Sequence, residues 1–271
     1  MSDLKLYGIF GFPLGHTLSP AMQEAAFRAL GIKGFYLPFE VRPNEFRRLL
    51  RRRKNLILDG FNVTVPYKEE ALKLVDKVHP TARAIGAVNT VVREGKRWIG
   101  FNTDAIGFIT ALKKDAKFRS RDKHVLLLGA GGSARAVAYA LAKAGARRVV
   151  IKNRTEARSR KMISRYRKLF PRVKWEKKLS FLGDIDLVVN ATSVGLKPGD
   201  PPLLRASDFP RKTLFVDLIY NPAETRFLRA ARLSGHRRMN GLGMLIYQGA
   251  EAFRLWTGRK APLNVMRKTI K

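Results

Sequence analysis

The sequence predicts an α/β protein of two domains, and three observations support this. The chain has 271 residues, of which 45% are hydrophobic, so it is long enough to bury two modest cores. Short apolar runs typical of strands alternate with segments whose apolar residues recur at helical spacing. From Lys123 onward the order is strand, glycine-rich turn, helix and strand, which favours a parallel sheet with right-handed crossovers.

The first domain is expected to span residues 1–104. Five strands are predicted in it, at 5–10, 35–41, 60–65, 87–92 and 98–101. A helix is expected to begin with Ser19 as its N-cap and Pro20 at its first position, and to end at Gly31. A second helix, at 43–54, has apolar residues on one side only, so we expect its basic residues to face water.

The second domain is expected to span residues 105–242. A helix at 106–112 opens it, and strands are predicted at 123–128, 148–151, 186–190 and 213–219. The first of these strands is a continuous apolar run, as the central strands of parallel sheets are. Residues 243–271 are predicted to form two helices separated by Gly258 and Pro262, and we expect them to pack back on the first domain.

The composition excludes several classes of site. The chain has no cysteine, so disulfides, thiolate catalysis and cysteine-ligated metals are excluded. Its four histidines are scattered, and no metal site is expected. No apolar run reaches the roughly 18 residues that a membrane span needs. The segment 1–12 lacks the pattern of a secretory signal, so a cytoplasmic protein is expected, either a monomer or a homodimer.

The net charge of +33 has two interpretations. A basic, solvated surface attracts small anions, whereas a nucleic-acid-binding protein uses its cations to neutralise phosphates. The densest basic segments, 47–54 and 158–168, match no zinc-finger, RRM or KH pattern. We therefore favour the solvated surface, and nucleic-acid binding remains the alternative.

A glycine-rich turn follows the strand at 123–128. It contains Gly129, Ala130, Gly131, Gly132 and Ser133, and it fits the pattern Gly-x-Gly-x-x-Ala between a strand and a helix. Glycines let the backbone approach a pyrophosphate, and the helix N-terminus offers free N–H groups. The turn predicts a dinucleotide site in a doubly wound, Rossmann-type domain; the alternative is a tight turn without a ligand.

The residues after the next strand indicate which dinucleotide binds. An NAD site usually carries Asp or Glu there, to bind the ribose 2′-hydroxyl. This chain has Asn153, Arg154 and Thr155, with Arg158 one turn later and no acid before Glu156. A guanidinium pairs with a 2′-phosphate, which a carboxylate would repel. The position favours NADP over NAD, unless these arginines are ordinary surface cations.

Polar residues gather where the strands of the first domain end, in the segments 15–20, 62–68, 86–90 and 102–104. Ligands of open α/β sheets bind at strand ends. Each segment alone could be turn chemistry. Together they resemble, in order and spacing, the signature segments of shikimate dehydrogenases. So do the glycine turn and the segments 153–155, 190–196, 217–220 and 240–248.

The resemblance implies NADP-dependent, reversible reduction of 3-dehydroshikimate to shikimate, in chorismate and aromatic amino acid biosynthesis. It implies that Lys68 and Asp104 are catalytic. Either Lys68, or the two residues as a coupled pair, moves the proton at the C3 oxygen, or Asp104 mainly orients Lys68 and the substrate hydroxyl; a surface ion pair is the alternative. It implies a substrate site made of Thr17, Ser19, Thr64, Lys68, Asn89, Asp104, Tyr220 and Gln248. It adds Leu218, Gly241 and Met244 to the cofactor residues.

Two of these positions leave alternatives open. Gln248 lies on an otherwise apolar helical stripe, so its amide needs a partner, which is either a ligand or a structural hydrogen bond. Thr17 stands where the family usually has serine, and the added methyl group narrows the pocket. A broader quinate/shikimate dehydrogenase is therefore the alternative within the family.

Overall fold

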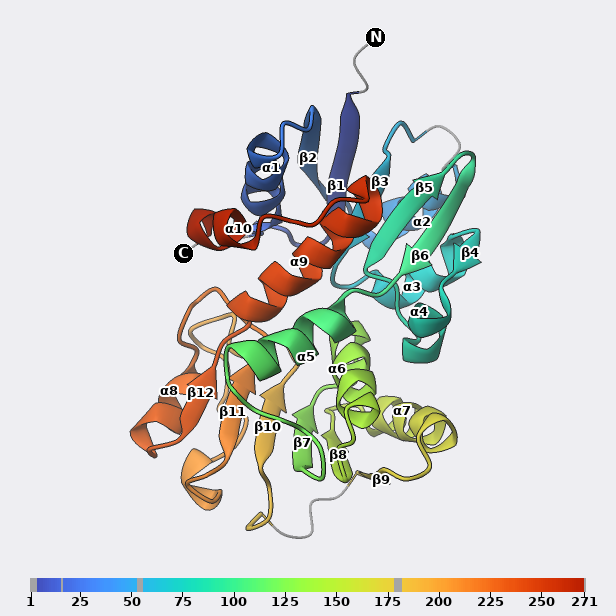
Figure 1. The fold of residues 1–271 in the computed structure, drawn as a ribbon. Helices are drawn as coiled ribbons and strands as arrows, with labels where there is room; N and C mark the ends of the chain where they lie inside the picture. The colour runs from blue at the N-terminus through green and yellow to red at the C-terminus, as the bar shows by residue number, and fades with distance from the viewer. Residues whose placement is uncertain (1–3, 16, 53–55, 178–181, 271) are drawn as a thin grey trace. The chain divides into compact units, whose positions relative to one another are not determined.

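A six-stranded sheet lies in each of the two units into which the chain divides (Figure 1). The computed structural model describes residues 4–15, 17–52, 56–177 and 182–270. One unit comprises Met1–Gly107 and Leu245–Lys271, and the other comprises Phe108–Met244. His16 of the predicted substrate segment, and Arg53 and Lys54 of the predicted second helix, lie outside the described residues.

The first unit contains a mixed sheet in the order β2-β1-β3-β5-β6-β4. Its strands are β1 (Lys5–Gly11), β2 (Gly34–Glu40), β3 (Gly60–Val63), β4 (Lys77–Val78), β5 (Thr90–Glu94) and β6 (Arg97–Phe101). Strand β1 is parallel to β2 and β3, whereas β5 is antiparallel to β3 and β6. The two-residue strand β4 was not predicted, because it is too short to show a periodic pattern.

Strand β5 begins at Thr90, three residues later than predicted. Gly86, at φ +81°, ends the helix α4 (Pro80–Ile85), and the Val88 N–H then bonds the carbonyl of Lys68. Asn89 therefore stands between a helix end and a strand start, in the same unit as Lys68.

The helix α1 (Ser19–Ala29) corrects one prediction. Ser19 is the first helical residue rather than the N-cap, which is Leu18 in a helical conformation without a side-chain bond. The Thr17 hydroxyl accepts the Ser19 N–H instead, at 3.4 Å. Gly31, at φ +63°, follows the end of the helix, as predicted. The other helices before α5 are α2 (Pro43–Arg51) and α3 (Lys68–Leu74).

The C-terminal helices return to the first unit, which confirms the prediction. These are α9 (Leu242–Thr257) and α10 (Leu263–Thr269). The Trp256 indole donates to the carbonyl of Val91 at 2.9 Å and stacks on Tyr7 with ring centroids 4.9 Å apart. A Cβ at Gly60 would lie 2.5 Å from the indole nitrogen, so only glycine lets Trp256 sit against β3.

The second unit contains a wholly parallel sheet in the order β12-β11-β10-β7-β8-β9. Its strands are β7 (His124–Leu128), β8 (Arg148–Lys152), β9 (Lys174–Glu176), β10 (Leu187–Asn190), β11 (Leu214–Asp217) and β12 (Arg237–Met239). Its helices include the end of α5 (Asp104–Lys114), α6 (Gly132–Lys143), α7 (Glu156–Leu169) and α8 (Arg226–Leu233). This is the doubly wound order, which confirms the predicted Rossmann-type domain. The order reverses between β7 and β10, where such folds bind dinucleotides.

Candidate active site

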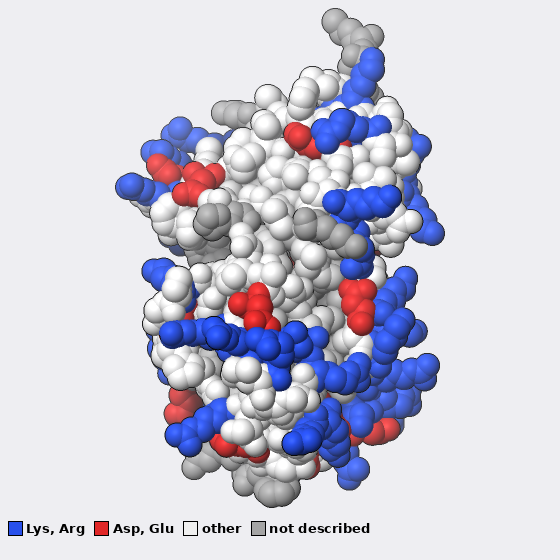
Figure 2. Space-filling model, turned by 90° about the vertical axis from the view of Figure 1, so that its left-hand side faces the viewer, with Lys and Arg blue, Asp and Glu red and all other residues white. Residues whose placement is uncertain are grey.

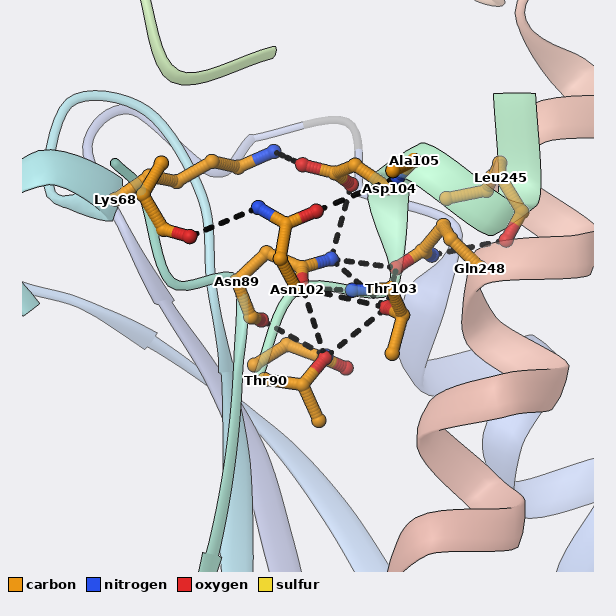
Figure 3. A network of polar contacts seen from close by, with 11 residues as sticks. Lys68, Asn89, Thr90, Asn102, Thr103, Asp104, Ala105, Leu245 and Gln248 are labelled. Atoms are coloured by element: carbon orange, nitrogen blue, oxygen red, sulfur yellow. Dashed lines mark hydrogen bonds and ion pairs between the residues drawn. The ribbon is translucent and has the colours of Figure 1, made fainter. Parts of the chain in front are cut away.

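Lys68 and Asp104 form a buried ion pair in the first unit (Figure 3). Lys68 is the first residue of α3, which follows β3, and Asp104 is the first residue of α5, which follows β6. The Lys68 Nζ lies 2.7 Å from the Asp104 Oδ2, and only 8% and 3% of these residues are exposed. The alternative of a surface ion pair is therefore wrong. A buried ammonium is able to donate a proton to a bound substrate.

Asn89 holds the second oxygen of this carboxylate. Its Nδ2 donates to the Asp104 Oδ1 at 2.9 Å and to the Thr103 hydroxyl at 2.9 Å. The Gln248 Oε1, on α9, lies 3.3 Å from the same nitrogen, and the Gln248 Nε2 donates to the carbonyl of Leu245. Gln248 therefore has structural partners. It is half-buried and borders the polar cluster of Lys68, Asn89 and Asp104.

Polar residues that the sequence analysis did not assign to the site lie behind this cluster. Asn62 of β3 donates to the carbonyl of Asn89 at 3.1 Å and to the Thr90 hydroxyl at 3.0 Å. The Tyr36 hydroxyl, from β2, donates to the Asn62 Oδ1 at 2.7 Å. Asn62 and Thr90 belong to the segments 62–68 and 86–90 that resemble the family. Their signal in the sequence was a polar side chain inside an apolar strand. Tyr36 had no such signal, because tyrosine is ordinary in a strand.

The remaining predicted substrate residues lie apart from these hydrogen bonds. Thr17 lies between β1 and α1, Ser19 begins α1, and Thr64 follows β3, all in the first unit. The hydrogen bonds of Asn89 and Asp104 described above go to other residues. Tyr220 belongs to the second unit, three residues after β11.

The glycine turn after β7 is closely packed at Gly129 and open at Gly131. Gly129 has φ +113°, and a Cβ there would lie 2.8 Å from the carbonyl oxygen of Ala191, so this glycine closes the turn against the chain after β10. Gly131 is the N-cap of α6, with an ordinary φ of −83°, and a Cβ there would meet nothing within 4 Å. Gly132 then begins α6, with Ser133 next. This open N-terminus fits a pyrophosphate.

The segment after β8 suits the 2′-phosphate of NADP. Asn153 donates from Nδ2 to the carbonyl of Thr155 at 2.8 Å, and Thr155 is the N-cap of α7. Arg154 and Arg158 are both exposed at this helix N-terminus. Two guanidinium groups at this position suit a 2′-phosphate, and no carboxylate precedes Glu156 there.

Leu218 and Gly241 meet in the second unit. A Cβ at Gly241 would lie 2.0 Å from the carbonyl oxygen of Leu218, so only glycine allows this approach. Met244, in the first turn of α9, is buried. The loop at Leu218 is held by the buried Asp217, which accepts from Asn190 at 3.0 Å, among other donors. Burial raises the Asp217 pKa, against the lowering effect of these hydrogen bonds.

Comparison with known proteins agrees with this arrangement. Residues 9–91 match the family model of the shikimate dehydrogenase substrate binding domain, 111–219 that of shikimate / quinate 5-dehydrogenase, and 241–271 that of the shikimate 5′-dehydrogenase C-terminal domain. The shikimate dehydrogenase (NADP(+)) of Halothermothrix orenii is 40% identical, over 97% of this chain and 94% of its own. That of Carboxydothermus hydrogenoformans is 43% identical, over 99% and 97%. This chain belongs to the shikimate dehydrogenase family.

A solved structure of the family has the same fold. Shikimate 5-dehydrogenase from Thermus thermophilus, in complex with NADP(H) and shikimate, is 40% identical and superposes with a TM-score of 0.87, covering 98% of both chains. The predicted family and the predicted fold class of this chain are thus confirmed.

The surface of this family member is strongly basic. On the face shown in Figure 2, Lys and Arg side chains gather in patches with few carboxylates between them. One helix, α8, exposes Arg226, Arg229 and Arg232. Such a surface raises the local concentration of anions. None of the helices within the described ranges is long and apolar enough to cross a membrane.

Proposed function

We propose that this protein catalyses the NADP-dependent, reversible reduction of 3-dehydroshikimate to shikimate. The observation that carries the proposal is the buried Lys68–Asp104 pair, bordered by Asn89 and Gln248, in a chain whose relatives are NADP-dependent shikimate dehydrogenases. Amide and hydroxyl side chains suit a substrate with several hydroxyl groups, and such a site rejects analogues that lack one.

Lys68 is the proposed proton donor. NADPH, when bound, supplies the hydride that adds to C3 of the substrate. The Lys68 ammonium gives its proton to the C3 oxygen, which becomes the hydroxyl of shikimate, and the neutral amine regains a proton from water. In the reverse direction the neutral amine takes the hydroxyl proton. Asp104 orients Lys68 through the 2.7 Å contact, and Asn89 holds the other carboxylate oxygen.

The other assigned residues have binding roles in this proposal. Thr17, Ser19, Thr64 and Tyr220, together with Asn89 and Gln248, bind the substrate. The turn from Gly129 to Ser133 binds the pyrophosphate, and Asn153, Arg154, Thr155 and Arg158 bind the 2′-phosphate half. Leu218, Gly241 and Met244 border the nicotinamide. We place the reaction in the cytoplasm.

The alternative within the family is a broader quinate/shikimate dehydrogenase. Thr17 supports it, because the methyl group that serine lacks changes the pocket around the substrate. The test is the appearance of reduced-nicotinamide absorbance with shikimate and NADP, then with NAD, and then with quinate. The proposal predicts the highest kcat/KM for shikimate with NADP. Equal kcat/KM for quinate would establish the alternative, and no reduction of NADP by shikimate would refute the proposed function.

A further inference from the structure

Four successive hydrogen bonds lead from the interior of the first unit to the carboxylate of the ion pair. The Tyr36 hydroxyl donates to the Asn62 Oδ1 at 2.7 Å, and the Asn62 Nδ2 donates to the Thr90 hydroxyl at 3.0 Å. The Thr90 hydroxyl donates to the Asn89 Oδ1 at 3.1 Å. The Asn89 Nδ2 donates to the Asp104 Oδ1 at 2.9 Å. All four bonds run in the same direction, so the five residues form one donor chain.

Because the side chains of this hydrogen-bonded series are buried, each of their polar groups needs its partner within the protein. Tyr36 and Thr90 are fully buried, and Asn62 and Asn89 are at most 5% exposed. Water therefore cannot replace a missing partner, and a donor that loses its acceptor stays unsatisfied. Hydrogen bonds in such a low-dielectric chain also polarise one another.

Neighbouring backbone groups fix the direction of the chain. The Asn62 Nδ2 also donates to the Asn89 carbonyl, which can only accept, so the Asn62 amide cannot turn over. The Asn89 Oδ1 accepts the Thr103 N–H at 2.7 Å, and this N–H can only donate. Thr90 receives a hydrogen from Asn62, and its own hydrogen has two acceptors within reach, the Asn89 Oδ1 and the Thr103 hydroxyl, both at 3.1 Å. Thr90 thus connects two amides whose orientations are both fixed.

We propose that Tyr36, Asn62 and Thr90 are positioning residues for the reaction, acting on the Lys68–Asp104 pair through Asn89. The inference rests on the proposed function. With Asn89 bonded to one oxygen of Asp104 and Lys68 to the other, the carboxylate plane is held, and the ammonium points in one direction. Loss of the chain frees Asn89 and leaves the pair less well aligned for proton transfer, since small misplacements of reacting groups are costly.

Thr90→Val is the decisive variant, because it keeps the shape and branching of the side chain and removes only the hydroxyl. Thr90→Ser keeps the hydroxyl and serves as the conservative rescue. Thr213→Val is the matched control: Thr213 is equally buried, donates its hydroxyl hydrogen to the Ile185 carbonyl at 2.6 Å, and lies in the second unit. Thr90→Val loses the hydrogen bonds to Asn62 and Asn89, whereas Thr213→Val loses the one to Ile185, so both variants should lose thermal stability and Thr90→Val the more.

The readout is kcat and KM for shikimate and NADP in the full-length protein. We expect Thr90→Val to lower kcat about tenfold with an unchanged KM for NADP, because the variant breaks the series of hydrogen bonds that aligns the pair. We expect Thr90→Ser to stay within about twofold of the unaltered protein, and Thr213→Val to keep its kcat. A wild-type kcat in Thr90→Val, or an equal fall in Thr213→Val, would overturn the inference.

Tyr36→Phe tests the far end of the same chain. It removes one hydroxyl, and we expect kcat to fall about threefold. Because Tyr36 acts on the ion pair only through Thr90, Tyr36→Phe should not lower kcat further in the double variant with Thr90→Val. Multiplied effects in the double variant would show two independent packing defects and overturn the inference. If Thr90→Val does not fold, an unchanged kcat in Tyr36→Phe would overturn it alone. Absence of shikimate oxidation in the unaltered protein would refute the proposed function instead, and is thus a separate result.

Discussion

Replacement of Lys68 by methionine separates the catalytic role of the ion pair from its structural role. Methionine keeps most of the volume of the lysine stem and removes the ammonium. General acid–base catalysis contributes about two to four decades of rate, so we expect kcat to fall by roughly 10²–10⁴. The KM for NADP should stay nearly constant, because Lys68 belongs to the first unit, whereas the glycine turn belongs to the second.

The structure also sets the expected cost in stability. Asp104 is 3% exposed, and its Oδ2 loses its partner at 2.7 Å in Lys68→Met. Removal of one member of a buried pair costs about 3–5 kcal/mol, because the other charge stays buried and uncompensated. In a chain of this size that corresponds to a Tm lower by on the order of 10 °C. The double variant Lys68→Met/Asp104→Asn removes both charges, so it should recover most of the lost Tm and none of the lost kcat.

Thermal unfolding followed by circular dichroism, together with steady-state reduction of NADP by shikimate, measures both effects. Near-normal turnover in Lys68→Met would refute the role of Lys68 as proton donor. An unchanged Tm in the single variant would refute the burial of the pair. Recovery of kcat in the double variant would show that the single variant had failed through instability alone.

Three further predictions concern the second unit. Arg154→Ala should raise the KM for NADP about tenfold and leave kinetics with NAD unchanged, as loss of a charge-assisted bond to a 2′-phosphate predicts; Lys161→Ala, further along α7, is the control. Gly131→Val should weaken NADP binding at unchanged Tm, because its Cβ enters open space, whereas Gly129→Ala should cost roughly 1–3 kcal/mol of stability, because of its positive φ. Its lysine and arginine partners lower the pKa of Glu156 from its ordinary value of 4.5 to about 2, so its contribution to stability is present above pH 4.5 and lost as the pH falls towards 2. Glu156→Gln should flatten that part of the pH–stability curve in urea unfolding, and an unchanged slope would contradict the assignment.

Local features of the fold were predictable from the sequence, because they depend on spacing within a few residues. The run from Lys123 to Ala134 reads as strand, turn and helix from its apolar residues and glycines alone. Arg154 follows the next strand, at the position where Rossmann-type folds bind the ribose of the dinucleotide. The N-cap assigned to Ser19 was wrong, because Leu18 already adopts a helical conformation and the pattern of residue types does not show backbone angles.

Contacts between distant segments were decided by the tertiary structure. Lys68 and Asp104 were paired by resemblance, yet their burial, and with it the difference from a surface ion pair, depends on how the segments after β3 and β6, the strands on either side of β5, come together. Gln248 reaches Asn89 across 159 residues, because α9 returns to the first unit. Tyr36 had no sequence signal, since a tyrosine in a strand is ordinary until a neighbouring strand places an amide against its hydroxyl. Residue order determines which groups are present, and only the packing of strands and helices determines which of them lose water and must bond to one another.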